Sequence, residues 1–67
     1  MELRDELTDR IFNACMNVLD ETPVIRMEAI ARVRKEAKID FATAERYMLE
    51  LVDLGILNYQ QEKYSLG

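Results

Sequence analysis

The spacing of apolar residues changes at Gly55, and this change constrains the fold more than any other feature of the chain. Before Gly55, apolar residues recur every three or four positions, which predicts a helix over residues 41–54. The buried face of this helix comprises Phe41, Ala44, Met48 and Leu51, joined by Tyr47 and Leu54. Gly55 stands where a left-handed residue ends many helices. Beyond it, Tyr59 and Tyr64 flank a polar centre, which predicts a β-hairpin over residues 56–66 with its tip near residues 60–62.

A first helix is predicted over residues 2–19, because apolar residues again recur at helical spacing. Its stripe consists of Leu3, Leu7, Ile11, Ala14, Cys15 and Val18, widened by Phe12 and Leu19. Pro23 disfavours helical geometry at the residue before it, so the helix is expected to stop near Asp20. Residues 22–25 are short and β-branched, which indicates an extended connector or a strand of a single bridge.

A second helix is predicted over residues 26–38. Its inner stripe comprises Met27, Ile30, Val33 and Ala37, with Ala31 at the edge. Asp40 then suits the N-cap of the third helix, where its carboxylate can accept a hydrogen bond from the backbone of Ala42 or Thr43. The chain is therefore expected to be one mostly α-helical domain over residues 1–67, with a small β-hairpin at its end.

Composition narrows the classes of function. The chain has 67 residues, with 13 acidic and 9 basic side chains and a net charge of −4, which excludes a uniformly basic nucleic-acid-binding surface. It has no histidine, the commonest general base and metal ligand, and its single Cys15 is expected to be a small buried hydrophobic residue. We therefore expect no enzyme activity, no cofactor and no metal site.

No stretch of about 18 apolar residues is present, so no membrane span is expected. The acidic N-terminus lacks the apolar core of a signal peptide. With a single cysteine and no export signal, the expected compartment is the cytoplasm.

The order helix, extended segment, helix, helix, hairpin resembles the winged-helix variant of the helix-turn-helix family. The resemblance is most specific over residues 44–57, where a helix breaks at Gly55 into the wing, and over residues 63–66, which resemble the returning wing strand. It implies the element order α-β-α-α-β-β, with the third helix as a recognition helix in the DNA major groove. It also implies a dimer interface that includes the first helix. The turn at residues 38–40 departs from the pattern, because it lacks the small residue often found there.

If the resemblance holds, the third helix presents one face outward. That face comprises Ala42, Thr43, Arg46, Glu50 and Asp53, with Glu45 and Leu49 at its flanks. Arg46 can read a guanine edge or clamp a phosphate, and Thr43 can bond a phosphate or touch a thymine methyl. The acids on this face oppose phosphate, so they form either a solvated surface or a protein contact.

Positive charge is concentrated in the second helix and the turn after it. Residues 26–38, here called the basic segment, hold five basic and two acidic residues, a local charge of +3. The basic residues are Arg26, Arg32, Arg34, Lys35 and Lys38. They are placed to anchor phosphates, while Lys63 with Gln60 and Gln61 can add wing contacts in the minor groove. Alternatively, Arg32 and Lys35 pair with Glu28 and Glu36 at helical spacing and have no further role.

Two functional hypotheses follow. The leading one is a small winged-helix DNA-binding protein, a transcriptional regulator acting as a dimer, with double-stranded DNA as partner. The alternative is a winged-helix protein-interaction module, either an adaptor, an inhibitor or a subunit of a larger complex. Its contact surface is formed by Glu45, Leu49, Glu50 and Asp53.

Overall fold

The structure, a computed structural model, describes residues 6–20 and 22–66. The elements in chain order are α1 (Glu6–Val18), β1 (Val24–Ile25), α2 (Arg26–Ala37), α3 (Phe41–Asp53), β2 (Leu57–Gln60) and β3 (Lys63–Leu66). The predicted fold class and element order are confirmed. Residues 2–5 of the predicted first helix lie outside the described residues, and Leu19 follows the end of α1.

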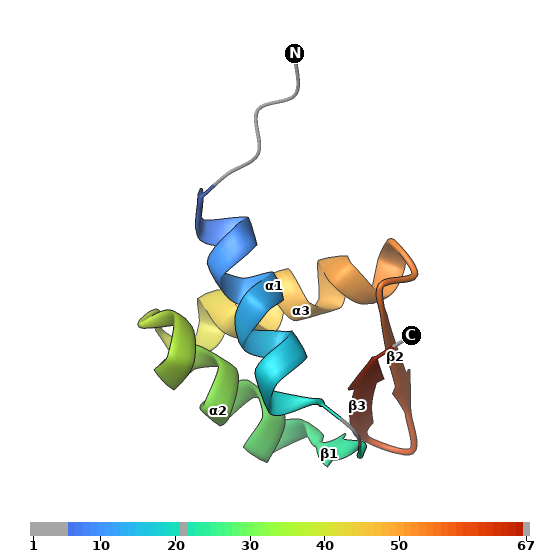
Figure 1. Cartoon of the computed structure of the whole chain (residues 1–67). Coiled ribbons are helices and arrows are strands. Elements are labelled where there is room, and N and C mark those ends of the chain that lie inside the picture. The colour runs from blue at the N-terminus through green and yellow to red at the C-terminus, as the bar shows by residue number, and fades with distance from the viewer. Residues whose placement is uncertain (1–5, 21, 67) are drawn as a thin grey trace.

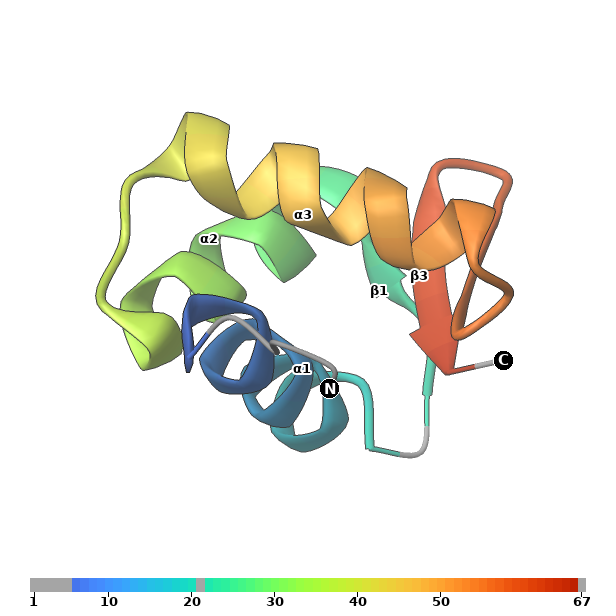
Figure 2. The same ribbon diagram turned by 90° about the horizontal axis from the view of Figure 1, so that it is seen from above.

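The three helices pack around one apolar core, with the strands at one end (Figure 1). In Figure 2, α3 crosses the molecule on the side opposite α1, and the strands lie at the same end of the molecule as the last turns of α3. The largest fully buried side chains are Tyr64, Ile11, Leu19, Ile30, Met48, Leu57, Val33 and Cys15. The core therefore joins the helices to the sheet. Among the described residues, no helix is both long and apolar enough to cross a membrane.

Two side chains predicted to face the core, Met27 and Leu54, and one predicted at the edge of the stripe, Ala31, lie at the surface instead. Met27 is 58% exposed and Leu54 is 69% exposed, and Ala31 is also exposed. In α2 the buried face is formed by Ala29, Ile30, Val33 and Ala37, so Met27 lies about 100° around the helix axis from the centre of that face. Leu54 follows the last residue of α3, where the chain turns away from the helix axis. Helical spacing therefore predicted the buried faces of α2 and α3 correctly at their centres but wrongly at their boundaries.

Helix α3 ends as predicted at Gly55, whose φ of 82° is left-handed. The N–H of Ile56 donates to the carbonyl of Leu51, and the N–H of Gly55 donates to that of Val52, both at 3.0 Å. These two bonds form a Schellman motif and satisfy carbonyls left free at the helix end. Helix α2 also ends at a left-handed residue, Lys38, which takes φ 61° and ψ 51° without being glycine, and the N–H groups of Lys38 and Ile39 both donate to the carbonyl of Arg34.

Asp40 occupies the N-cap of α3 with an extended backbone, but its carboxylate makes no capping hydrogen bond. No bond of full capping geometry to Ala42 or Thr43 is thus present, although Thr43 lies beside the carboxylate, through its side chain first and its backbone N–H second. Hydrogen bonding from the Thr43 side chain lowers the pKa of the Asp40 carboxyl, and the positive charge of nearby Arg34 adds to the effect.

The predicted hairpin is β2 and β3, and the extended connector is β1. The sheet is antiparallel in the order β1-β3-β2, with Gln60 opposite Lys63 and Tyr59 opposite Tyr64. The two turn residues, Gln61 and Glu62, have φ values of 52° and 60°, which define a type I′ turn. Tyr64 is buried, whereas Tyr59 covers it from the exposed side, with ring centroids 4.8 Å apart.

The wing turn is joined to the start of α2. The backbone N–H of Arg26, the first residue of α2, donates to the carbonyl of Glu62 at 2.8 Å. This bond satisfies one of the N–H groups that a helix leaves free at its beginning. It therefore sets the position of the wing tip relative to α2.

Candidate nucleic-acid interface

The outward face of α3 forms a shallow depression of about 400 Å³, here called the α3 depression. It is lined by Ala42, Glu45, Arg46, Leu49, Glu50 and Asp53. This set agrees with the outward face expected from the sequence, except that Thr43 is half-buried and lies outside the lining. Leu49 is 47% exposed among the acids. The structure thus brings together the residues of α3 named in both functional hypotheses.

An ion pair neutralises one acid of the depression. The guanidinium of Arg26 donates to Oε2 of Glu45, across the start of α2 and the middle of α3. This hydrogen bond, together with the charge of Glu45, raises the pKa of Arg26 above its usual value. Both side chains are about one-third exposed, so the ion pair is open to solvent.

Charge is therefore unequal along α3. In its N-terminal half, Glu45 is balanced by Arg26, and Arg46 remains exposed over the ring of Tyr47 at 6.0 Å. In its C-terminal half, Glu50 and Asp53 are both exposed. Within residues 6–20 and 22–66 neither of these two acids makes an ion pair. An anion would thus approach the N-terminal half of α3 more easily than the C-terminal half.

The basic segment is divided between two sides of α2. Arg26 faces α3, and Arg34 lies near enough to Asp40 at the start of α3 to lower its pKa further, after hydrogen bonding from Thr43. Arg32 and Lys35 instead border a second depression of about 410 Å³, which α2 forms with the end of α1. The complete lining is Asn17, Val18, Arg32, Lys35 and Glu36. The five basic residues therefore do not form a single surface.

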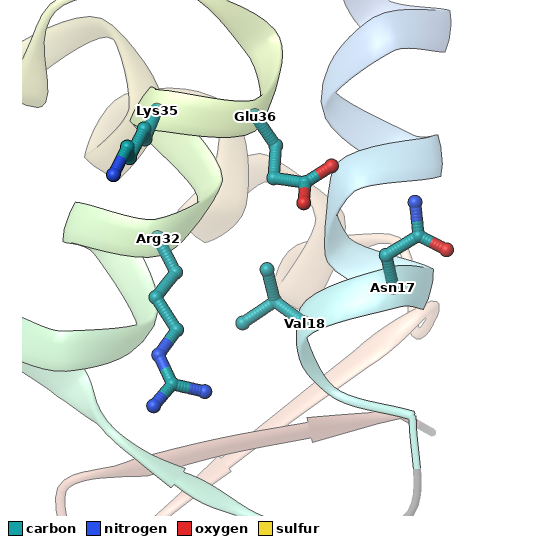
Figure 3. A pocket seen from close by; sticks show the side chains of 5 residues that line it. All are labelled: Asn17, Val18, Arg32, Lys35 and Glu36. Atoms are coloured by element: carbon teal, nitrogen blue, oxygen red, sulfur yellow. The ribbon is translucent and has the colours of Figure 1, made fainter.

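Figure 3 shows how the side chains of this second depression lie. Arg32 and Glu36 extend toward Val18 of α1, whereas Lys35 projects away from α1. Arg32 also pairs with Glu28 one turn before it, which confirms that part of the alternative interpretation. In the described part of the chain, Lys35 and Glu36 make no ion pair.

The remaining cations lie at the two ends of α2. Lys38 follows the last residue of α2. Lys63 lies beside the wing tip, where the carbonyl of Glu62 accepts a hydrogen bond from Arg26, the first residue of α2. At 1.5 Å per residue, a helix of 12 residues separates these two points by about 18 Å. Gln60, Gln61 and Lys63 are all exposed. Lys38 therefore lies just before α3, and Lys63 lies near the opposite end of α2.

Among the described residues, Cys15 and Tyr64 are ionisable side chains buried in the core. Cys15 is fully buried, and burial raises the pKa of its thiol to about 12. The hydroxyl of Tyr64 is also buried, with no hydrogen-bond partner. Among the described residues, no three histidine, cysteine or acidic side chains gather in an arrangement suited to a metal ion.

Comparison of the chain with protein-family models, with curated proteins and with solved structures finds no match. The likeness to winged-helix domains therefore rests on the element order and on the hairpin that follows the third helix.

Two features of this surface have no signal in the sequence. The pairing of Arg26 with Glu45 joins residues 19 positions apart in different helices, beyond the reach of spacing rules. The depression between α1 and α2 depends on how the two helices pack, which side-chain order alone does not determine.

Proposed function

We propose that this winged-helix-like domain binds double-stranded DNA, with the N-terminal half of α3 directed at the major groove. The Arg26–Glu45 ion pair is the observation that supports this proposal most. It neutralises the carboxylate that directly precedes Arg46 in the sequence of α3, and the positive charge of Arg34 acts on Asp40. Arg46 and Lys38 then remain as exposed positive charges around the start of α3.

Each contact residue has a distinct role in this proposal. Lys38 and Arg34 anchor phosphates on one side of the groove, and Lys63 with Gln60 and Gln61 does so at the wing. Arg46 reaches base edges, which suits the tendency of recognition helices to read bases with their N-terminal residues. Thr43 is half-buried and has a shorter side chain than Arg46, so it extends less far toward DNA. Regulation of transcription is the role that such a module fits.

A titration of labelled random-sequence duplex at low salt tests this function. Lys38→Ala is expected to weaken binding to all sequences alike, because a phosphate contact contains no sequence information. Arg46→Ala is expected to alter sequence preference instead. The matched control is Lys35→Ala, which removes an equal charge from the side of α2 away from α3 and has a smaller effect. Complete absence of binding at about 10⁻⁴ M protein would reject the function.

A second function is supported by a separate observation on α3. In the C-terminal half of the α3 depression, Leu49 is half exposed beside the unpaired Glu50 and Asp53, an arrangement that suits a basic protein partner with an apolar anchor. Leu49→Arg separates the two functions. It abolishes binding of a protein partner but leaves DNA binding equal or tighter, because it adds positive charge.

A further inference from the structure

Exposed apolar side chains gather where α3 passes into the hairpin. Leu54 is 69% exposed, and Ile56, Tyr59 and Leu66 are each 37% exposed. Residues 54–61 also contain no charged side chain. Strands at the edge of a sheet are usually protected from pairing with another chain by charges or proline, and this segment has neither.

Strand β2 lies at the open edge of the sheet, and Figure 1 shows no other element beyond it. The two-residue turn makes Gln60 and Lys63 a hydrogen-bonded pair, so Tyr59 and Tyr64 form the next, non-hydrogen-bonded pair. By this alternation, the N–H and C=O groups of Leu57 and Tyr59 point away from β3. Two residues of β2 thus offer unused backbone donors and acceptors to a further strand.

We propose that β2 pairs antiparallel with β2 of a second copy of this chain, about a two-fold axis at Asn58. In this register Leu57 of each copy faces Tyr59 of the other, and the two Asn58 side chains meet at the axis. The outward N–H and C=O groups of both strands are then used. The exposed Leu54, Ile56 and Tyr59 lie along or beside the joined edge and lose contact with water.

Charge favours a second copy at this edge over one elsewhere. Each copy has a net charge of −4, so a two-fold contact through acidic surfaces brings like charges together. The outward face of α3 has three acids, whereas residues 54–61 have none. The first helix, which the resemblance implied as a dimer interface, exposes only Met16 among the large apolar residues of its described part.

Sedimentation equilibrium of the full chain, from about 1 µM to about 1 mM, tests the proposal. A strand contact this small is expected to give a dissociation constant of about 10⁻⁴ M. Asn58→Lys places two like charges directly opposite at the axis and is expected to raise the dissociation constant of the dimer about two- to fivefold. Gln61→Lys adds the same charge in the turn beyond the paired strands, and the dimer persists. Circular dichroism confirms that both variants are folded.

Amide hydrogen exchange locates the contact. The N–H groups of Leu57 and Tyr59 are expected to become protected as the protein concentration rises, whereas those of Asn58 and Gln60 are protected at every concentration. A chain that stays monomeric at about 1 mM overturns the proposal. So does a dissociation constant that Asn58→Lys leaves unchanged, and so does protection confined to α1 or α3. None of these results depends on whether the protein binds DNA.

Discussion

Replacing Glu45 with Gln is expected to tighten DNA binding. Residue 45 borders the face of α3 that is proposed to approach DNA. The substitution removes the carboxylate that holds Arg26 and leaves the guanidinium free for a phosphate. Each phosphate contact contributes about 0.9 to the slope of log affinity against log salt concentration. One added contact therefore increases affinity about eightfold at 0.1 M salt and steepens the slope by about 0.9.

Glu28→Gln is a closely matched control. It changes the net charge by the same amount and frees Arg32, but Arg32 borders the depression beside α1 rather than the α3 depression. We expect a change of less than about twofold for this variant, from overall charge alone. Fluorescence anisotropy with a labelled duplex at several salt concentrations measures both affinity and slope. Equal effects from the two variants would refute the argument, because binding would then follow net charge rather than the face of α3.

Four further predictions concern the backbone and the core. Gly55→Ala is expected to lower the free energy of unfolding in urea by about 1–2 kcal/mol, entirely through its left-handed φ, because no atom lies within 4 Å of the added carbon. Lys38→Gly relieves the same strain and raises that free energy by up to about 1 kcal/mol, while weakening DNA binding. Gln61→Asn combined with Glu62→Gly suits the type I′ turn and is expected to raise the melting temperature. Burial raises the pKa of the Cys15 thiol to about 12, so it is expected to resist thiol reagents at pH 8 unless urea is added. Because the thiol of the unfolded chain ionises near pH 9.0, the free energy of unfolding is expected to fall as the pH rises from 9 to 12.

Local sequence patterns predicted each helix and strand because the signals lie within a few residues of the structure they determine. Pro23 separates α1 from β1, and Gly55 ends α3 with the two backbone bonds of a Schellman motif. The change from helical spacing to a hairpin is visible for the same reason. Burial of Met27 and Leu54 was predicted wrongly, because the edges of an apolar stripe depend on how neighbouring helices pack.

The candidate interface was only partly predictable. The outward residues of α3 follow from helical geometry, and the structure places them around one depression. The effective charge of that depression does not follow from the sequence, because the partner of Glu45 comes from another helix. Five basic residues that are close in the chain also do not form one basic surface, because α2 directs their side chains to different sides. Arg32 and Lys35 border the depression between α1 and α2, whereas Arg26 pairs with Glu45 of α3.

The positions of backbone strain are relevant to the proposed function. Lys38, Gln61 and Glu62 take left-handed conformations that glycine would adopt at lower cost. Lys38 lies between α2 and α3, and the other two residues form the turn between β2 and β3. All three side chains are exposed. A side chain kept where glycine would be more stable contributes something other than stability. The strain therefore supports a contact role for Lys38 and Gln61, and it explains why Lys38→Gly is expected to stabilise the fold while weakening DNA binding.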